Sequence, residues 1–333
     1  MNADEAIVVK NAGSHFLLSR LPEWNPFPAV LRGKVRLSRS VSTNPVAVGD
    51  MVRFRTDLPG GWAPPSNVAE GGTPPGGDAA ADPLAVITEV LPRRNYIIRK
   101  STNLSRQNHV IAANLDRAVL AVSLYFPEIK LPFLDRVLVT CEVYGVKPVI
   151  VLNKVDLYRD AAPEAVENFV SIYTKAGYHV IQTSCKTGEG IDELRLLCSE
   201  GISLFSGESG VGKSSLIKAL DPSLDPKIGK ISAAHLQGRH TTSLYEMYPL
   251  LGGGFVVDSP GLRGFGLVDL KAEEIALYFP EMLAASKNCR FTPCTHTHEP
   301  GCAVKSAVEE GIVSPERYNS YLGMLEEDTK FRQ

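Results

Sequence analysis

The stretch that most constrains the fold is residues 207–215, whose sequence is GESGVGKSS. An apolar run at 202–205 precedes it, and Leu216, Ile217 and Leu220 follow with the spacing of one helix face. In this strand-turn-helix context the pattern G-x-x-x-x-G-K-[ST] binds phosphate, because its glycines turn backbone N–H groups inward and the helix N-terminus adds positive charge. The stretch predicts a nucleoside triphosphate site; the alternative is a chance glycine-rich turn before a helix.

Every residue of this loop is a candidate nucleotide contact. Lys213 is expected to reach the β- and γ-phosphates and to serve catalysis, and Ser214 is expected to offer its hydroxyl to Mg²⁺. The candidate residues are Gly207, Glu208, Ser209, Gly210, Val211, Gly212, Lys213, Ser214 and Ser215.

A second motif, Asn153-Lys154-Val155-Asp156, directly follows an apolar run at 148–152. The Asp156 carboxylate can accept two parallel hydrogen bonds from the N1–H and the exocyclic amine of guanine, which adenine cannot supply. A buried carboxylate left unpaired costs about 1 to 3 kcal/mol or more, so the motif predicts GTP or GDP rather than adenine nucleotides. Asn153 and Lys154 are expected to brace the base pocket and the phosphate loop.

Ser184, Cys185 and Lys186 follow the next strand pattern, at 179–183. The tripeptide resembles the second base-contacting loop of GTPases, in which backbone N–H groups meet the guanine carbonyl. Its place directly after the strand that follows the guanine motif favours this interpretation.

Two further stretches are typical of loops that sense the γ-phosphate. A polar segment from about residue 226 ends in Gly238-Arg239-His240-Thr241-Thr242, and either threonine could complete Mg²⁺ coordination. Asp258 and Gly261 match D-x-x-G at the end of an apolar strand; Asp258 would reach Mg²⁺ through water, and the Gly261 N–H would reach the γ-phosphate.

The order of these motifs is permuted, because the guanine motif and the base loop precede the phosphate loop. Such a rearrangement is tolerated when the termini of a domain lie close together. Strand and helix patterns alternate from about 113 to 285, which predicts one doubly wound, circularly permuted P-loop α/β domain. The D-x-x-G segment then lies near the carboxyl end of the domain, so we expect that its movement could act on the segment that follows.

The first 95 residues show short alternating strands with turns between them, which suits an OB-type β-barrel. A proline- and glycine-rich stretch at 58–83 is expected to be a flexible insertion in this barrel. Arg32, Lys34 and Arg36 would share one strand face, which is either an RNA-contacting surface or an ordinary solvated face. A second basic cluster, Arg93, Arg94, Arg99, Lys100 and Arg106, runs through the connector to the next domain.

The last segment, 286–333, is expected to be a small zinc-binding α module. Cys289, Cys294, His296 and Cys302 offer three thiolates and one imidazole, the ligand set of one closed, structural zinc site. His298 is a competing imidazole, and unrelated reduced cysteines are the alternative to a metal site. A segment this short needs such a substitute for a core.

Composition sets outer limits. The 333-residue chain has a formal charge of -2, so nucleic-acid binding must come from local patches. It contains no run of eighteen apolar residues, and its amino-terminal residues are acidic where a secretory signal is basic. These features predict a cytoplasmic protein that does not bind membranes.

Together these motifs resemble the bacterial family of ribosome small-subunit-dependent GTPase A (RsgA, also called YjeQ), over essentially the whole chain. The resemblance implies a monomeric GTPase of low intrinsic activity that the 30S subunit stimulates, through contacts with 16S rRNA, late in that subunit's maturation. It also favours His296 over His298 as the zinc ligand.

Leu262 stands where Ras-like proteins carry the glutamine that orients the attacking water, so slow intrinsic turnover is expected. His240 is the candidate replacement, supported by the resemblance; otherwise it is an exposed loop histidine. Two other functions compete with a ribosome-coupled GTPase. One is an RNA-binding protein whose nucleotide is only structural, and the other is a P-loop ATPase or nucleotide kinase, which the guanine motif disfavours.

Overall fold

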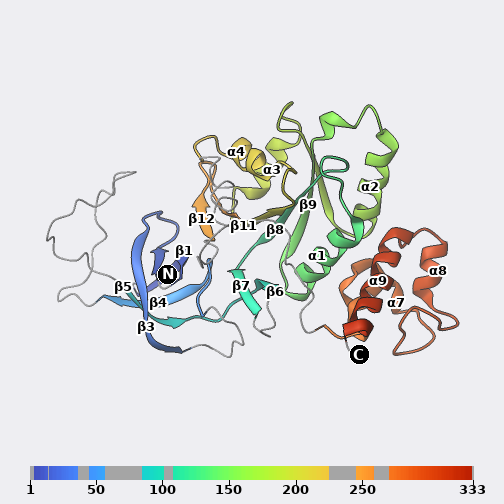
Figure 1. Cartoon of the computed structure of the whole chain (residues 1–333), viewed down its shortest axis with the longest axis horizontal. Coiled ribbons are helices and arrows are strands. Elements are labelled where there is room, and N and C mark those ends of the chain that lie inside the picture. The colour runs from blue at the N-terminus through green and yellow to red at the C-terminus, as the bar shows by residue number, and fades with distance from the viewer. Residues whose placement is uncertain are drawn as a thin grey trace.

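The computed structural model describes residues 4–13, 15–36, 45–56, 85–100, 108–224, 245–258 and 270–331. Within these ranges, a barrel of strands at the N-terminal end, a central sheet with helices and a C-terminal group of helices follow one another along the long axis (Figure 1). The predicted insertion at 58–83 lies outside the described residues. None of the helices in the described part has the length and apolar character to cross a bilayer.

The amino-terminal strands close into a five-stranded barrel. They are β1 (Glu5–Ala12), β2 (His15–Ser19), β3 (Phe27–Arg36), β4 (Met51–Thr56) and β5 (Ala85–Val90). Their order is β1-β2-β3-β5-β4, and an additional β1–β4 pairing closes the ring. In β4, Val52 and Phe54 are buried while Arg53 is exposed, which is the alternation of a strand with one face on a core. The predicted OB-type barrel is therefore confirmed.

The connector to the central sheet contains an antiparallel pair, β6 (Tyr96–Lys100) and β7 (Asn108–Ala113), which the sequence patterns did not predict. Two arginines of the supposed basic cluster make ion pairs within the chain. Arg93 Nε lies 2.6 Å from Asp50 Oδ1, and Arg94 Nη2 lies 2.7 Å from Asp116 Oδ1. Burial raises the pKa of the Asp50 carboxyl, and the Arg93 guanidinium opposes that rise. These two arginines join the barrel and the connector to the sheet.

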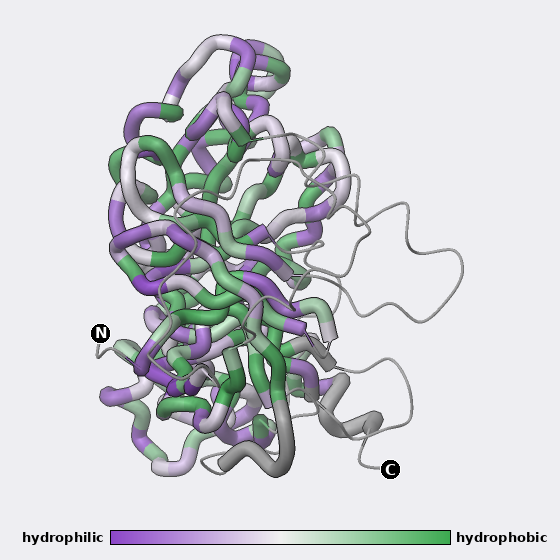
Figure 2. Tube along the Cα trace, turned by 90° about the vertical axis from the view of Figure 1, so that its left-hand side faces the viewer, coloured by the Kyte–Doolittle hydropathy of each residue, from purple (hydrophilic) through white to green (hydrophobic). Residues whose placement is uncertain are grey.

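The central sheet is parallel except at one edge. Its strands run in the order β10 (His179–Thr183), β9 (Lys147–Asn153), β8 (Arg117–Val122), β11 (Ile202–Gly207) and β13 (Phe255–Asp258), with β12 (Glu246–Pro249) antiparallel beside β13. Figure 2 shows apolar segments, in green, running through the interior of the molecule. Near-continuous burial, as in β8 and β9, is expected of parallel strands covered on both faces.

Helices cover both faces of this sheet. Residues of α1 (Leu131–Val143) and α2 (Pro163–Lys175) share a core with Leu120 and Ile150. Residues of α3 (Ile191–Cys198) and α4 (Lys213–Leu220) share a second core with Val119 and Phe205. Since alternate residues of the same strands enter the two cores, the predicted doubly wound α/β fold is confirmed.

The barrel and the central sheet join at one strand edge. Strand β1 pairs antiparallel with β12, with Lys10 opposite Glu246. Ile7 and Val9 of β1 belong to the same apolar core as Met247 of β12 and Val257 of β13. The barrel is therefore packed on the sheet rather than only tethered to it.

The carboxyl-terminal part consists of α6 (Ala272–Ile275), the 3₁₀ turn η2 (Ala276–Tyr278), α7 (Pro280–Ser286), α8 (Ala303–Glu309) and α9 (Pro315–Phe331). One core collects Phe279 and Met282 with Val304, Ala307 and Tyr321. Helices on both sides of residue 286 therefore share this core.

A buried arginine ties α9 to the rest of the molecule. Arg317 is 1% exposed; its Nη1 donates to Asp135 Oδ1 of α1 at 2.7 Å, and its Nε donates to Glu281 Oε1 of α7 at 2.5 Å. Its guanidinium carbon lies 4.7 Å from the centre of the Phe279 ring. The planar, permanently charged guanidinium suits such a buried position between two carboxylates and an aromatic face.

Replacing this arginine should be costly. Arg317→Met removes one charge and leaves Asp135 and Glu281 buried without it, so we expect a loss of about 3 to 5 kcal/mol of unfolding free energy, measured by urea denaturation. Arg159→Met is the control, because the Arg159–Glu189 pair is 41% and 40% exposed and should contribute about 1 kcal/mol or less. Equal small losses in both variants would contradict this account of Arg317.

Candidate functional site

The sequence motifs meet at one edge of the central sheet. Asn153 ends β9, Thr183 ends β10, Gly207 ends β11 and Asp258 ends β13. These four strands are parallel, so their carboxyl ends face the same way. Ligands of open α/β sheets bind at this edge. The strand order thus brings together motifs that are as far apart in the chain as Asn153 and Asp258.

Asn153 links three of these loops. Its Nδ2 donates to the Val211 carbonyl of the phosphate loop at 2.8 Å, and its Oδ1 accepts a hydrogen bond from the Thr183 hydroxyl at 3.0 Å. A Cβ on Gly212 would lie 2.5 Å from Asn153 Nδ2, and Gly212 has φ +96°. Glycine is therefore required where the two loops touch.

Lys154 fastens the same two loops from the other side. Its ammonium donates to the Gly210 carbonyl and to the Phe126 carbonyl, each at 2.5 Å. The backbone of Lys154 is left-handed, with φ 64°, a conformation that is uncommon outside glycine and that clusters at functional sites. The lysine stem is thereby held between the guanine motif and the phosphate loop.

Asp156 lies in a short 3₁₀ turn, η1 (Val155–Leu157), and is held by the base loop. The Ser184 hydroxyl donates to Asp156 Oδ1 at 2.6 Å and accepts hydrogen bonds from the Lys186 and Thr187 N–H groups, each at 3.2 Å. Cys185 between them is exposed. The orientation of the carboxylate is therefore set by the same loop that the sequence placed beside the base.

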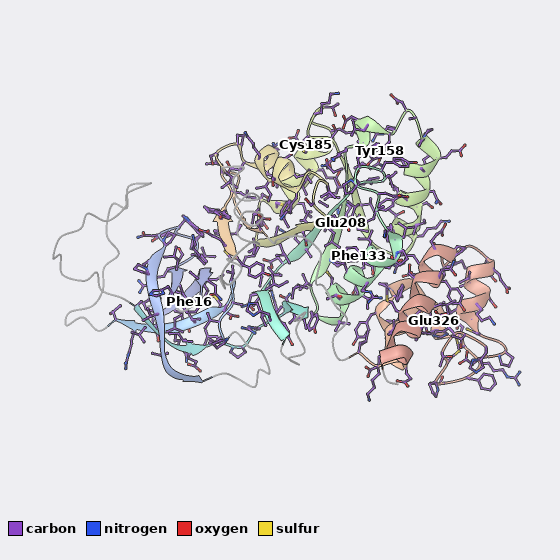
Figure 3. All side chains as sticks on the ribbon, in the orientation of Figure 1. Phe16, Phe133, Tyr158, Cys185, Glu208 and Glu326 are labelled. Carbon is purple, nitrogen blue, oxygen red and sulfur yellow. The ribbon has the colours of Figure 1, made fainter. Side chains whose placement is uncertain are left out.

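In the phosphate loop, backbone crowding explains the glycines. A Cβ on Gly207 would lie 2.7 Å from the Ala121 carbonyl oxygen. Val211 is buried, whereas Ser209, Gly210 and Ser215 are exposed and Glu208 and Ser214 are half-buried. Tyr158, Cys185 and Glu208 all lie in the central α/β part, away from Phe16 of the barrel and Glu326 of α9 (Figure 3).

The phosphate-loop lysine is paired with the D-x-x-G aspartate. Lys213 Nζ makes an ion pair with Asp258 Oδ1, and the two side chains are only 12% and 11% exposed. A lysine and an aspartate paired at the phosphate loop fit a polyphosphate and its cation, because the lysine would bind the phosphates and the aspartate would bind the cation. His240, Thr241, Thr242 and Gly261 lie outside the described residues.

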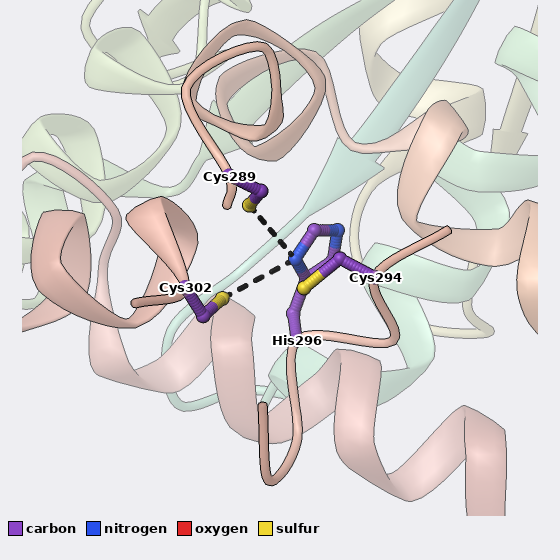
Figure 4. A group of neighbouring side chains, drawn as sticks. All are labelled: Cys289, Cys294, His296 and Cys302. Carbon is purple, nitrogen blue, oxygen red and sulfur yellow. Dashed lines mark hydrogen bonds between the residues drawn. The ribbon is translucent and has the colours of Figure 1, made fainter. Parts of the chain in front are cut away.

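The cysteine and histidine candidates of the carboxyl-terminal part also come together. One donor atom from each of Cys289, Cys294, His296 and Cys302 lies within 4.8 Å of the others (Figure 4). His296 Nδ1 is 3.7 Å from Cys289 Sγ and 3.4 Å from Cys302 Sγ. In a tetrahedral zinc site with bonds of about 2.0 to 2.3 Å, donors are separated by roughly 3.3 to 3.8 Å, so the four groups fit that ion.

The protonation of these groups also suits a cation. Burial lowers the pKa of His296, which keeps the imidazole neutral and able to act as a ligand. Burial, followed by the thiols of Cys302 and Cys289, raises the pKa of Cys294 to about 12. The Cys294 thiolate therefore needs a nearby positive charge, which a bound metal ion would supply. His298 is exposed, and its Nδ1 lies 2.9 Å from the Thr297 hydroxyl.

Helix α9 holds the backbone of this cluster. The hydroxyl of Tyr318 donates to the His296 carbonyl and that of Tyr321 to the Thr295 carbonyl, each at 2.6 Å. Although burial opposes it, hydrogen bonds from Thr295 and from backbone N–H groups lower the pKa of Glu299 to about 2. Glu299 is thus a charged brace for the loop at neutral pH.

Sequence reasoning missed several of these supports. The Phe126 carbonyl, the Tyr158 hydroxyl that donates to the Asn153 carbonyl at 2.5 Å, and the two tyrosines of α9 all act through the backbone of another segment. Backbone acceptors leave no trace in a motif. The only available signal was the aromatic pair Tyr125 and Phe126 directly after an apolar strand.

The barrel, the permuted order of nucleotide motifs on one sheet edge and the carboxyl-terminal Cys/His cluster define a circularly permuted GTPase. A model of the RsgA GTPase family matches residues 90–268. The chain therefore belongs to the RsgA GTPase family, as its sequence resemblance predicted, and is a GTP hydrolase.

Full-length relatives and solved structures agree with this assignment. The protein named Small ribosomal subunit biogenesis GTPase RsgA from Bacteroides fragilis is 42% identical over 330 residues, covering 98% of this chain and 99% of the relative. The protein of that name from Porphyromonas gingivalis is 41% identical and covers 98% of each chain.

Two solved structures have the same overall arrangement. The crystal structure of YjeQ from Thermotoga maritima has a TM-score of 0.74 at 30% identity, covering 97% of this chain and 98% of the other. The structure of YloQ, described as a circularly permuted GTPase, has a TM-score of 0.68 at 25% identity, covering 100% and 98%.

The serine that holds Asp156 offers a test of the base site. Ser184→Ala removes a hydrogen bond to a charged group, worth about 1.5 to 3 kcal/mol, so affinity for a fluorescent GDP analogue should fall roughly tenfold or more. Ser199→Ala is the control, because that hydroxyl donates only to the Leu196 carbonyl in its own helix turn. Unchanged affinity in Ser184→Ala, with the fold intact by circular dichroism, would contradict this role.

Proposed function

We propose that this protein couples GTP hydrolysis to binding and release of the small (30S) ribosomal subunit late in its maturation. The observation that carries the proposal is the clamp formed by Asn153 and Lys154, which fastens a guanine-selective loop onto a phosphate loop. The relatives' name, Small ribosomal subunit biogenesis GTPase, supports the ribosomal half.

On the base side, Asp156 accepts two hydrogen bonds from guanine. Ser184 holds the carboxylate in place and accepts the Lys186 N–H, which leaves the backbone N–H of Cys185 to face the guanine carbonyl. Asn153 and Lys154 position these groups over the phosphate loop. Asp156 is exposed rather than buried as its motif predicted, so adenine, which supplies neither donor, loses the two hydrogen bonds without leaving a buried charge unpaired. The site therefore favours GTP over ATP through hydrogen bonds that only guanine can make.

On the phosphate side, the N–H groups of residues 207–215 surround the phosphates, and Lys213 exchanges Asp258 for the β- and γ-phosphates. Ser214 and Asp258, together with Thr241 or Thr242, would hold the Mg²⁺ that accompanies the nucleotide, and the Gly261 N–H would contact the γ-phosphate. Bound Mg²⁺ supplies neutralisation of the charge that develops on the phosphate oxygens.

The site lacks a glutamine after the D-x-x-G motif to orient the attacking water. Leu262 cannot orient it, so intrinsic turnover is slow, and His240 is the group that we assign to this role in the complex with the 30S subunit. Enzyme and ribosome together then complete the site.

We assign three working parts to the chain: a barrel (1–95) with its insertion (58–83), a GTPase domain (113–285) and a zinc-binding domain (286–333). We assign contacts with 16S rRNA to the barrel and to the zinc-binding domain. We also assign the protein to the cytoplasm, as a monomer. Cys289, Cys294, His296 and Cys302 would hold one structural zinc ion, which adds to the small core shared by the carboxyl-terminal helices.

Phosphate release with titrated 30S subunits tests substrate, partner and coupling together. The GTPase rate should rise at least tenfold and saturate with 30S, whereas 50S subunits serve as the control. Lys213→Ala should abolish the activity, and His240→Ala should lower only the stimulated rate while leaving GTP affinity nearly intact. A rate that is independent of 30S subunits would refute the ribosomal coupling.

The zinc assignment predicts about one zinc ion per chain by elemental analysis. Cys302→Ser or a chelator should remove it and should increase hydrogen exchange across residues 287–302, because the cluster then loses its central ion. Cys141→Ser, at a buried thiol outside the cluster, is the control and should keep the metal. A purified chain without zinc but with a protected cluster would overturn the assignment.

A further inference from the structure

The edge at which the barrel meets the central sheet carries an ion pair. Lys10 of β1 lies opposite Glu246 of β12, and Lys10 Nζ is 2.8 Å from Glu246 Oε2. The two side chains are 32% and 28% exposed. A pair this exposed contributes little to the free energy of unfolding. Its position between the barrel and the nucleotide site suggests another role.

Glu246 is also the cross-strand neighbour of the nucleotide site. Within the β12–β13 hairpin, Glu246 lies directly opposite Asp258, whose carboxylate is paired with Lys213. Residues opposite one another in an antiparallel pair point to the same face, with their Cβ atoms about 4.5 to 5.5 Å apart. Two carboxylates therefore sit side by side, each paired with a lysine from a different part of the molecule.

Tyr248 is a further ionisable residue near these two carboxylates. It lies two residues beyond Glu246 on the same face of β12. Burial, and then the charges of Glu246 and of Asp258, raise the pKa of the Tyr248 hydroxyl. Because Tyr248 lies opposite Val256, two residues before Asp258, its side chain shares one face of the hairpin with both acids.

Like charges placed opposite one another on a sheet repel, and either of them attracts a nearby cation. If Glu246 lost the Lys10 ammonium, its carboxylate would compete with Asp258 and with phosphate for Lys213. Its charge would also repel an anionic nucleotide. Both effects act in the same direction, because each weakens the hold of the site on polyphosphate.

We propose that Lys10, in the barrel, is a positioning residue of the nucleotide site, which keeps the Glu246 carboxylate from competing for Lys213. The proposal rests on the roles assigned above to Lys213 and Asp258. Lys10 acts through Glu246 rather than on the nucleotide itself. The barrel thereby contributes to nucleotide affinity through a single side chain.

The test measures equilibrium affinity for fluorescent GDP and GTP analogues, with Mg²⁺ and again with EDTA. Lys10→Met should raise both dissociation constants about threefold to fivefold, as expected for one partly exposed charge. It should raise KM for GTP while leaving kcat unchanged. Lys10→Arg, which keeps the charge, and the double variant Lys10→Met with Glu246→Gln should both return to within about twofold of the wild type.

Salt and a matched barrel variant complete the design. The Lys10→Met effect should shrink at high ionic strength, because screening weakens interactions between partly exposed charges. Arg53→Met is the control, since Arg53 pairs with Glu5 and Glu89 within the barrel and should leave nucleotide affinity unchanged. If Lys10→Met does not fold, Lys10→Gln gives the same comparison with a polar side chain on the strand.

Unchanged affinity in Lys10→Met, or a loss that Glu246→Gln does not restore, would overturn the proposal. A failure of the assigned site itself looks different: Lys213→Ala would then bind nucleotide as tightly as the wild type.

Discussion

The rest of the site depends on the hydrogen bonds of one buried amide. Asn153 is 2% exposed and uses both ends of its side chain, one on the phosphate loop and one on the strand that leads to the base loop. A buried amide is costly to leave unsatisfied, so it fixes the relative position of loops that come from β9, β10 and β11. The guanine pocket and the phosphate loop are therefore one rigid unit.

This unit explains why the permuted chain order is tolerated. The sheet places β9 and β11 on either side of β8, and neither pairing depends on which strand comes first in the chain. The permutation changes which strands lie at the two ends of the domain. The β12–β13 hairpin becomes the last part of the sheet, where one edge meets the barrel and the chain continues into the carboxyl-terminal helices.

Buried charges determine how the three parts are held together. Asp50 and Arg93 join the barrel to the connector, and Arg317 joins α9 to α1 and α7. Removing ions from water is expensive, so each buried charge needs a partner with good geometry. These pairs fix the orientation of the barrel and of α9 relative to their neighbours. Helix α9 also holds the loop that carries His296, through the Tyr318 hydroxyl.

Local sequence patterns predicted most of the elements, although not the β6–β7 pair, and they predicted which loops lie at the sheet edge. Strand β10 has the predicted bounds, and the barrel, the α/β sheet and the guanine and phosphate loops follow from alternation, burial and motif spacing, which are properties of neighbouring residues. The roles of the site residues stay predictions, and His240, Thr241, Thr242 and Gly261 also lie outside the described ranges.

Only the tertiary structure decided which charged groups meet. Arg93 and Arg94 looked like part of a basic cluster, yet they pair with Asp50 and Asp116; Lys10 meets Glu246 more than two hundred residues away. Such pairs depend on strand order and on the register of one strand against another. A sequence pattern predicts which face of a segment is buried, but it does not predict which other segment packs against that face.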